Sequence, residues 1–183
     1  MDEVFDNKLV GVKIQLLEGG KLPEQATEEA AGMDLFACIN SQGSVAIENI
    51  KQDYFFLQLV GEDGEHVAPD SYEIIMPGAT KVISAGFRVE LPKGYEMQVR
   101  PRSGNSLKTS LRIANSPGTI DSDYRGNVGV IIENTGKDPV VIFDGDKIAQ
   151  AVIQEVPSVV LQLVNDLSET VRGTGGFGST DKK

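Results

Sequence analysis

The chain has 183 residues, of which 40% are hydrophobic and 24% charged, a composition typical of one soluble domain. Its net charge of −10 repels nucleic acid and anionic lipid, so we expect neither as a partner. No run approaches the roughly 20 apolar residues that cross a bilayer, and the start lacks signal-peptide features. The single cysteine, Cys38, favours a reducing cytoplasm.

Apolar side chains recur at every second residue, or crowd into β-rich runs, in seven segments. A period of two is that of a half-buried strand. In chain order the segments are Val10–Leu16, Phe87–Leu91, Tyr95–Val99, Val128–Ile132, Pro139–Phe143, Lys147–Gln154 and Ser158–Val164. Turn sequences rich in Gly, Pro, Asn and Asp separate several of them. Many short strands at close spacing predict an all-β fold: a sandwich, a jelly roll or a barrel.

Helix signals are brief. We expect short helices at Ala26–Ala31 and Ser103–Ser110, with Ser103 as the N-cap of the second. Residues 40–80 are more polar and acidic and interrupt the strand pattern, so we interpret them as an insertion with an exposed His66.

The C-terminal segment 172–180 contains four glycines in six consecutive positions, which is too flexible a backbone for a helix or strand. A single aromatic residue, Phe177, lies among them without a local core to join. The pattern predicts a hinged arm with an aromatic tip.

Five of the six arginines lie in the segment 100–125 or near the C-terminus. Arginine recognises phosphate oxygens with a fork of donors, and a helix that begins at Ser103 would present free N–H groups beside Arg102. This pattern favours a polyphosphate site. The alternative is that the arginines pair with some of the 27 acidic residues on the surface.

The segment Gly118–Gly126 places Asp121 and Asp123 next to Tyr124 and Arg125. The pattern fits a metal site, a general base or a charged hairpin, and the spacing alone favours the hairpin. The chain has no His/Cys cluster for zinc, no Walker-type loop and no Ser-His-Asp set. Any catalysis must therefore rely on carboxylates, arginines, backbone amides and the aromatic arm.

Five segments resemble, in order, the five sequence motifs of the dUTPase family. They are AGMDL from Ala31, RPRSGNSLKTSL from Arg100, NSPGTIDSDYRGNVGV from Asn115, GDKIAQAV from Gly145 and RGTGGFGST from Arg172. The resemblance implies a distorted jelly-roll-like β barrel over residues 1–165 and a flexible glycine-rich arm over 166–183. It further implies a homotrimer that shares its active sites between subunits, and Mg²⁺-dependent hydrolysis of dUTP to dUMP and pyrophosphate.

The resemblance also implies a role for each matching residue. Asp121 corresponds to the carboxylate that activates the attacking water, Tyr124 to the aromatic that stacks under the deoxyribose, and Asp34 to the acid that reaches Mg²⁺ through water. The uracil pocket corresponds to Asn115, Thr119, Ile120 and Gly129. The phosphate binders correspond to Arg102, Ser103, Gly104 and Gln150. The closing arm corresponds to Arg172, Phe177, Ser179 and Thr180.

Two alternatives stay open. In a dCTP deaminase, which shares this fold, a glutamate is expected at the position of Ile131, and Glu133 is out of register for that role. A regulatory role would use residues 40–80 to bind a protein partner, alone or beside catalysis, although a decorated surface loop is the simpler interpretation. The insertion would suit a phage or viral enzyme acting in the host cytoplasm as well as a cellular one.

Overall fold

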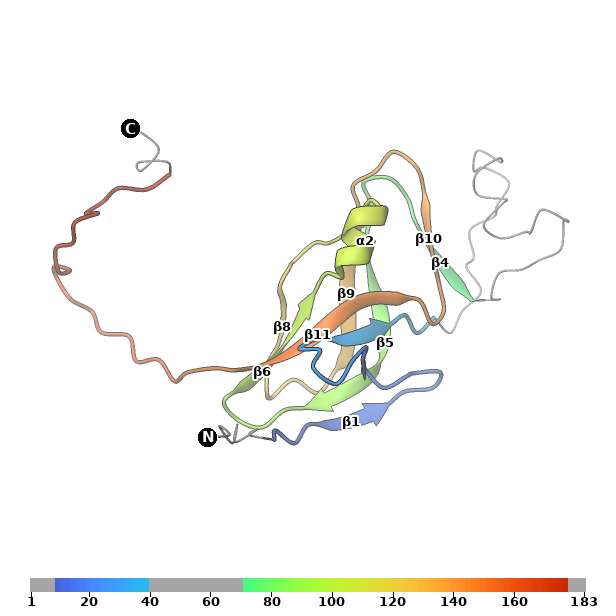
Figure 1. The fold of residues 1–183 in the computed structure, drawn as a ribbon, viewed down its shortest axis with the longest axis horizontal. Coiled ribbons are helices and arrows are strands. Elements are labelled where there is room, and N and C mark those ends of the chain that lie inside the picture. The colour runs from blue at the N-terminus through green and yellow to red at the C-terminus, as the bar shows by residue number, and fades with distance from the viewer. Residues whose placement is uncertain (1–8, 40–70, 178–183) are drawn as a thin grey trace, which may run out of the picture.

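The computed structural model describes residues 9–39 and 71–177, and they form an almost entirely β structure (Figure 1). The strands are β1 (Lys13–Leu16), β2 (Glu24–Gln25), β3 (Met33–Phe36), β4 (Tyr72–Ile75), β5 (Thr80–Glu90), β6 (Tyr95–Arg100), β7 (Leu111–Ile113), β8 (Gly118–Ile120), β9 (Asn127–Asn134), β10 (Val140–Phe143) and β11 (Lys147–Glu155). Within these ranges the one helix is α2 (Ser103–Lys108), between β6 and β7. The all-β prediction is confirmed.

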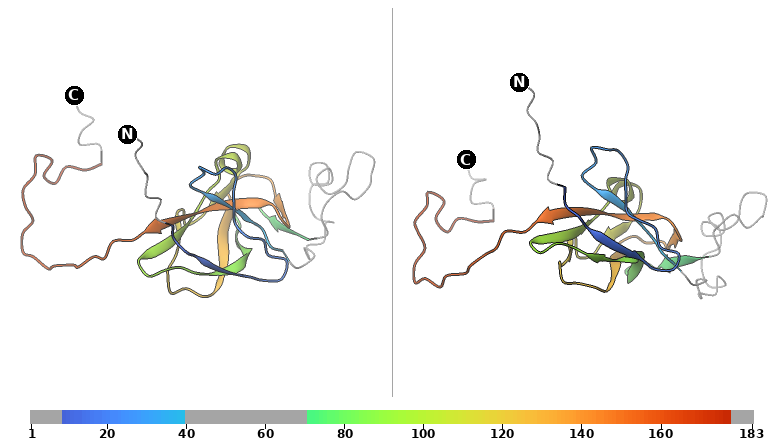
Figure 2. Two further views of the ribbon diagram at one scale, coloured as in Figure 1. Left: turned by 60° about the horizontal axis from the view of Figure 1, so that its bottom comes forward. Right: turned by 90° about the horizontal axis from the view of Figure 1, so that it is seen from below.

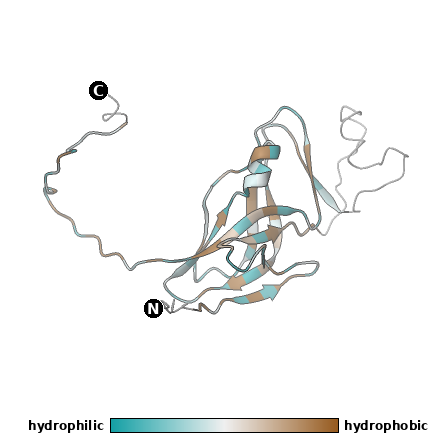
Figure 3. Cartoon of the chain, in the orientation of Figure 1, coloured by the Kyte–Doolittle hydropathy of each residue, from teal (hydrophilic) through white to brown (hydrophobic). Residues whose placement is uncertain are grey.

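The strands form three antiparallel sheets. One has the order β1-β5-β9-β7, a second β2-β3-β11-β6-β8, and a third pairs β10 with β4. The inward side chains of all three sheets form a single apolar core. Along β9, for example, Val128, Val130 and Ile132 are buried, whereas Gly129 and Ile131 face outward. This is the alternation expected of a strand with one buried face. Figure 3 shows hydrophobic and hydrophilic residues interspersed along the strands of the three sheets.

Both helix predictions need correction. Residues 26–31 form a turn, in which Ala30 N donates to Thr27 O at 3.0 Å, and not a helix. In α2 the N-cap is Arg102, with extended backbone and no side-chain cap, and Ser103 is already helical. The helix ends at Lys108 because Thr109 returns to an extended conformation.

The strand predicted at Ser158–Val164 is absent, so that prediction is wrong. After β11 the chain leads away from the sheets, as both views in Figure 2 show, and its side chains are exposed. A strand requires a neighbour for its backbone hydrogen bonds, and this segment has none within the described chain. Alternating apolar residues are therefore not sufficient by themselves to form a strand.

Residues 40–70 lie outside the described residues, and with them most of the predicted insertion and His66. The remainder of the 40–80 segment belongs to the fold, since β4 pairs with β10 and Ile75 is fully buried. Among the described residues, no helix has the length and apolar character to cross a membrane.

A buried asparagine connects the end of β9 to three other parts of the fold. Asn134 donates from Nδ2 to the carbonyls of Ile75 (2.9 Å) and Asp138 (2.8 Å). Its Oδ1 accepts from Ser110 Oγ (2.7 Å) and Gly136 N (2.9 Å). Since Ser110 closes the turn between α2 and β7, Asn134 helps to fix the position of α2.

Candidate active site

The first half of the candidate site is an ion-pair cluster around Asp34 on β3. Arg102, which follows β6, donates from Nε to Asp34 Oδ1 at 2.7 Å and from Nη2 to Oδ2 at 3.3 Å. Lys147, the first residue of β11, places its Nζ 2.8 Å from Oδ2. Asp34 is only 8% exposed, so two cations surround a carboxylate that has little contact with water.

These charges decide the protonation state of the carboxyl group. Burial raises the pKa of Asp34, but the hydrogen bonds and positive charges of Lys147 and Arg102 outweigh burial and lower it below the ordinary value of 3.8. Asp34 is therefore ionised at neutral pH.

Sheet register brings Gln150 to the same cluster. Gln150 on β11 lies opposite Asp34 on one side and Arg100 on the other, and its Nε2 donates to Pro101 O at 2.8 Å. Its side chain occupies the space that a Cβ at Gly32 would need, which explains the glycine just before β3. Asp34, Arg102 and Gln150, predicted from separate motifs, are thus brought together.

Ser103 and Gly104 open α2 immediately after Arg102, and both are exposed. The first N–H groups of a helix have no partner within the helix, so they are available to an anion. Asn105 anchors this turn, because its Nδ2 donates to Lys147 O at 2.8 Å. The start of α2 is therefore fixed to the start of β11.

The second half of the candidate site is the β8–β9 segment, residues 115–129. β8 pairs with β6 and β9 with β5 and β7, in different sheets, so these two strands do not form the hairpin predicted from the sequence. Asp121 follows β8 and is exposed, and its carbonyl accepts from Tyr124 N at 3.1 Å. The Tyr124 hydroxyl donates to Asn127 O at 3.0 Å, and its ring lies where a Cβ at Gly126 would be. The turn after β8 thus fixes the Tyr124 ring against Gly126 and Asn127, three residues after the exposed Asp121.

The residues predicted for the uracil pocket lie along the same β8–β9 segment, on strands of two different sheets. Thr119 and Ile120 belong to β8, Asn115 precedes it, and Gly129 lies on β9. The Asn115 amide approaches Gly118, the first residue of β8. An open groove of about 990 Å³ borders Asp121, Asp123 and Arg125 and continues to Val156, where the C-terminal segment begins.

Asp121 and Arg102 lie near opposite ends of β6. Ile120, which precedes Asp121, is paired with Met97, and Arg102 follows Met97 by five residues. At ~3.3 Å per residue of strand, Ile120 and Arg102 are at most about 17 Å apart along the strand direction. The Arg102 guanidinium is bound to Asp34, so it is directed to the first half of the site and not to Asp121.

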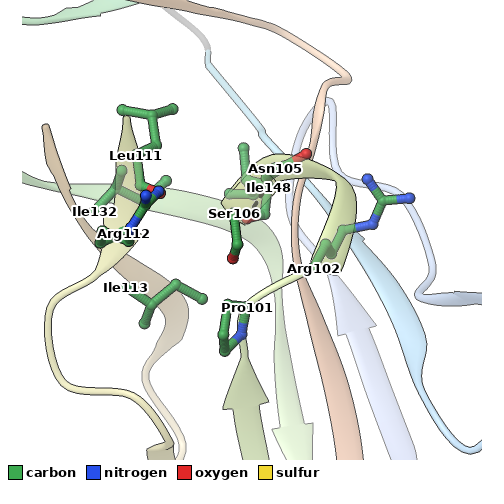
Figure 4. Close-up of a pocket in the computed structure, with 9 residues that line it drawn as sticks. All are labelled: Pro101, Arg102, Asn105, Ser106, Leu111, Arg112, Ile113, Ile132 and Ile148. Carbon is green, nitrogen blue, oxygen red and sulfur yellow. Dashed lines mark hydrogen bonds between the residues drawn. The ribbon is translucent and has the colours of Figure 1, made fainter. Parts of the chain in front are cut away.

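A small pocket under α2 is not the substrate site. It has a volume of about 20 Å³, room for about one water molecule, and is lined partly by Ile113, Ile132 and Ile148. In Figure 4 the guanidinium of Arg102 points away from this pocket.

The described part of the predicted arm, up to Phe177, contributes no contact to either half in this chain. Arg172 and Phe177 are exposed on the segment that leads away from the sheets. Ser179 and Thr180 lie outside the described residues.

The described part of the chain contains no group of three or more His, Cys, Asp or Glu side chains that could hold a metal. Asp34 nevertheless suits an indirect contact. A carboxylate has about four acceptor positions, and Arg102 and Lys147 use three of them. The remaining position can accept a hydrogen bond from a water bound to Mg²⁺, which itself prefers phosphate oxygens and waters.

Two residues of the first half had no predicted role, Lys147 and Asn105. Both lie inside motifs that the sequence resemblance quoted, but neither position alone indicates a contact. Their roles depend on the register of β11 with β3, in which Lys147 lies opposite Phe36. That register is a property of the fold.

Comparison with known proteins links the chain to one enzyme family. The dUTPase family profile matches residues 64–181. A deoxyuridine 5′-triphosphate nucleotidohydrolase of Syntrophotalea carbinolica is 38% identical over 174 residues, which cover 94% of this chain and 98% of the relative. One of Caulobacter vibrioides is 51% identical over 115 residues, or 63% of this chain and 74% of the relative.

Solved structures share the fold at lower identity. A mutant dUTPase of Staphylococcus bacteriophage 80alpha with dUpNHpp has a TM-score of 0.71 and 24% identity, covering 93% of this chain and 98% of the phage chain. A mutant dUTPase from phage phi11 of S. aureus, with a coordinated structural Mg(II) ion, has a TM-score of 0.64 and 24% identity, over 85% and 97% of the two chains.

Proposed function

Because the chain belongs to the dUTPase family, we propose that it hydrolyses dUTP to dUMP and pyrophosphate at a site shared between chains. Its relatives named deoxyuridine 5′-triphosphate nucleotidohydrolase support the reaction. The separation of the two half-sites along β6 supports the shared site. A dCTP deaminase is not favoured, since the matching family and relatives are dUTPases.

In the proposed assembly, a homotrimer, the β8–β9 segment of one chain faces the Asp34–Arg102 cluster of another. The β8–β9 segment supplies the general base Asp121 and the contacts with the sugar and uracil, and the cluster receives the triphosphate. The exposure of Asp121 and Tyr124 supports this arrangement, since both are open to an adjoining chain. Arg172, Phe177, Ser179 and Thr180 then complete the site from the arm.

The chemistry needs one base and a site for the leaving group. Asp121 accepts a proton from water as the water oxygen bonds to the α-phosphorus, and the bond from that phosphorus to the bridging oxygen breaks. Pyrophosphate leaves from the opposite side, where Arg102, the N–H groups at Ser103 and Gly104, and Gln150 stabilise its charge.

Mg²⁺ is the proposed cofactor, and when bound to the triphosphate it would neutralise part of the charge on the leaving group. Asp34 would contact it through water, using the acceptor position that Arg102 and Lys147 leave free. The phi11 dUTPase with its structural Mg(II) ion supports the assignment by analogy.

Specificity for uracil and for deoxyribose is proposed to come from the β8–β9 segment. Asn115 and the backbone at Thr119, Ile120 and Gly129 would pair with the uracil edge, so that cytosine would leave buried polar groups unpaired. The ring of Tyr124 would fill the space of a ribose 2′-hydroxyl.

Two further proposals concern the cellular compartment and a second binding partner. The single Cys38 supports the cytoplasm. A partner site within residues 40–80 stays a prediction.

Mixing two inactive variants tests the shared site. Asp121→Asn and Arg102→Ala chains should each lose activity alone, because each damages a different half. After the two are unfolded together and refolded in equal amounts, about a quarter of the sites would combine two intact halves, and activity should recover to about that fraction. No recovery, with mixed oligomers demonstrated by mass spectrometry, would contradict a shared site.

A further inference from the structure

Lys147 occupies a central position in the Asp34 cluster. Its ammonium group contacts Asp34 Oδ2 at 2.8 Å and lies 5.6 Å from the centre of the Phe36 ring. Its carbonyl accepts from Asn105 Nδ2 at 2.8 Å and from Arg102 Nη1 at 3.4 Å. The same residue therefore contacts the carboxylate, the arginine and the helix that starts after that arginine.

Arg102 has two competing partners in the proposed reaction. In the structure, its Nε and Nη2 donate to the two oxygens of Asp34. A triphosphate carries more charge than one carboxylate and accepts the same forked geometry. When Arg102 turns its donors to the phosphates, Asp34 loses two of its three hydrogen bonds while it remains largely buried.

An ionised carboxylate left without a partner in such a place is costly. Lys147 removes that cost, because its contact with Oδ2 does not involve Arg102. Lys21, whose Nζ also lies 5.6 Å from the Phe36 ring, adds further positive charge. The cluster of Asp34, Arg102, Lys147 and Lys21 carries a net charge of about +2 at neutral pH in a chain whose net charge is −10.

We propose that Lys147 is a positioning residue for the triphosphate, which holds Asp34 charged and in place while Arg102 moves from that carboxylate to the phosphate oxygens. This inference rests on the proposed function. Lys147 is not assigned a contact with substrate, since its ammonium is already engaged by Asp34 and the Phe36 ring.

The test compares Lys147→Met with Lys147→Arg and with Lys81→Met. Lys81 is a matched control, because it pairs with Glu73 at 2.6 Å and its side chain is 39% exposed, against 42% for Lys147. Calorimetry measures the affinity of the trimmed ligand dUMP and of dUpNHpp, in which an imido group replaces the oxygen whose bond would break.

Lys147→Met should weaken dUpNHpp binding about tenfold, the effect of one charge-assisted hydrogen bond at a half-exposed site, and leave dUMP binding within about twofold. KM for dUTP should rise by a similar factor with kcat little changed. Lys147→Arg should restore most of the affinity, because it retains the charge. Lys81→Met should resemble the wild type in every measurement.

The inference would be overturned if Lys147→Met lost equal affinity for dUMP and dUpNHpp. It would also be overturned if Lys147→Met and Lys81→Met bound dUpNHpp with the same affinity. These results are separable from failure of the proposed function. If wild-type protein hydrolyses dUTP and Lys147→Met behaves like the wild type, only the role of Lys147 fails. If wild-type protein neither binds dUpNHpp nor hydrolyses dUTP, the proposed function fails as well.

Discussion

Replacing Asn134 with alanine tests how the fold positions α2 and therefore Arg102. The side chain is fully buried and makes four hydrogen bonds. A buried hydrogen bond contributes about 1 kcal/mol net, and more where its loss leaves a partner unsatisfied. Asn134→Ala should therefore lower the free energy of unfolding by about 4 kcal/mol, a large part of the ~5–15 kcal/mol of a typical domain.

Two further variants make this prediction specific. Ser110→Ala removes one of the four bonds and should cost about 1 kcal/mol. Asn127→Ala, at the exposed start of the same strand, removes contacts with Ser84 Oγ that water can replace, and should cost less than about 1 kcal/mol.

Urea unfolding followed by circular dichroism, at one fixed protein concentration, measures all three. A cost for Asn134→Ala that is no larger than that for Asn127→Ala would refute the reasoning, since it would mean that the buried bonds contribute nothing beyond exposed ones. A cost near 4 kcal/mol should also be accompanied by weaker phosphate binding, because α2 loses its anchor.

Four other predictions follow from the site. Asp121→Asn should lower kcat by about 10²–10⁴-fold while calorimetry finds dUpNHpp affinity nearly unchanged, and near-normal turnover would exclude Asp121 as the base. Tyr124→Ala should narrow the ratio of kcat/KM between dUTP and UTP, and an unchanged ratio would count against sugar stacking. Deleting residues 172–183 should abolish most turnover but leave Tm almost unchanged, because the described part of this segment is exposed. A large fall in Tm would show instead that this segment stabilises the fold. Because the pKa of Asp34 is lowered in the folded state, its ion pairs stabilise the fold fully above pH 3.8 and less as the pH falls below that value. The difference in unfolding free energy between wild type and Asp34→Asn should therefore shrink in acid. A difference that does not change from pH 7 to pH 3 would contradict this.

The strands were predictable because their period of two directly reflects burial on one face. The run Val128–Ile132 illustrates this, since it became the centre of β9 with alternate residues in the core. Segments whose structure depends on a distant partner were not predictable in the same way. Ser158–Val164 has a strand-like sequence but finds no neighbouring strand within the described chain.

The candidate site shows the same division. Sequence motifs identified Asp34, Arg102 and Gln150 separately, and their meeting results from the register of β3, β11 and β6. The contacts of Lys147 and Asn105 arise from that register too, so no local pattern could have indicated them. The placement of Asp121 and Arg102 near opposite ends of β6 likewise follows from sheet pairing, and the proposed shared site builds on it.

The most direct test of the central claim is pyrophosphate release from dUTP, dCTP, UTP and dTTP, each measured with Mg²⁺ and with EDTA. We expect release from dUTP alone, and only with the metal, because the β8–β9 segment is proposed to pair with the uracil edge and the triphosphate to carry the cation. Release from dCTP or UTP at a rate similar to that from dUTP would contradict the specificity assigned to the β8–β9 segment. No release from dUTP under either condition would contradict the proposed activity itself.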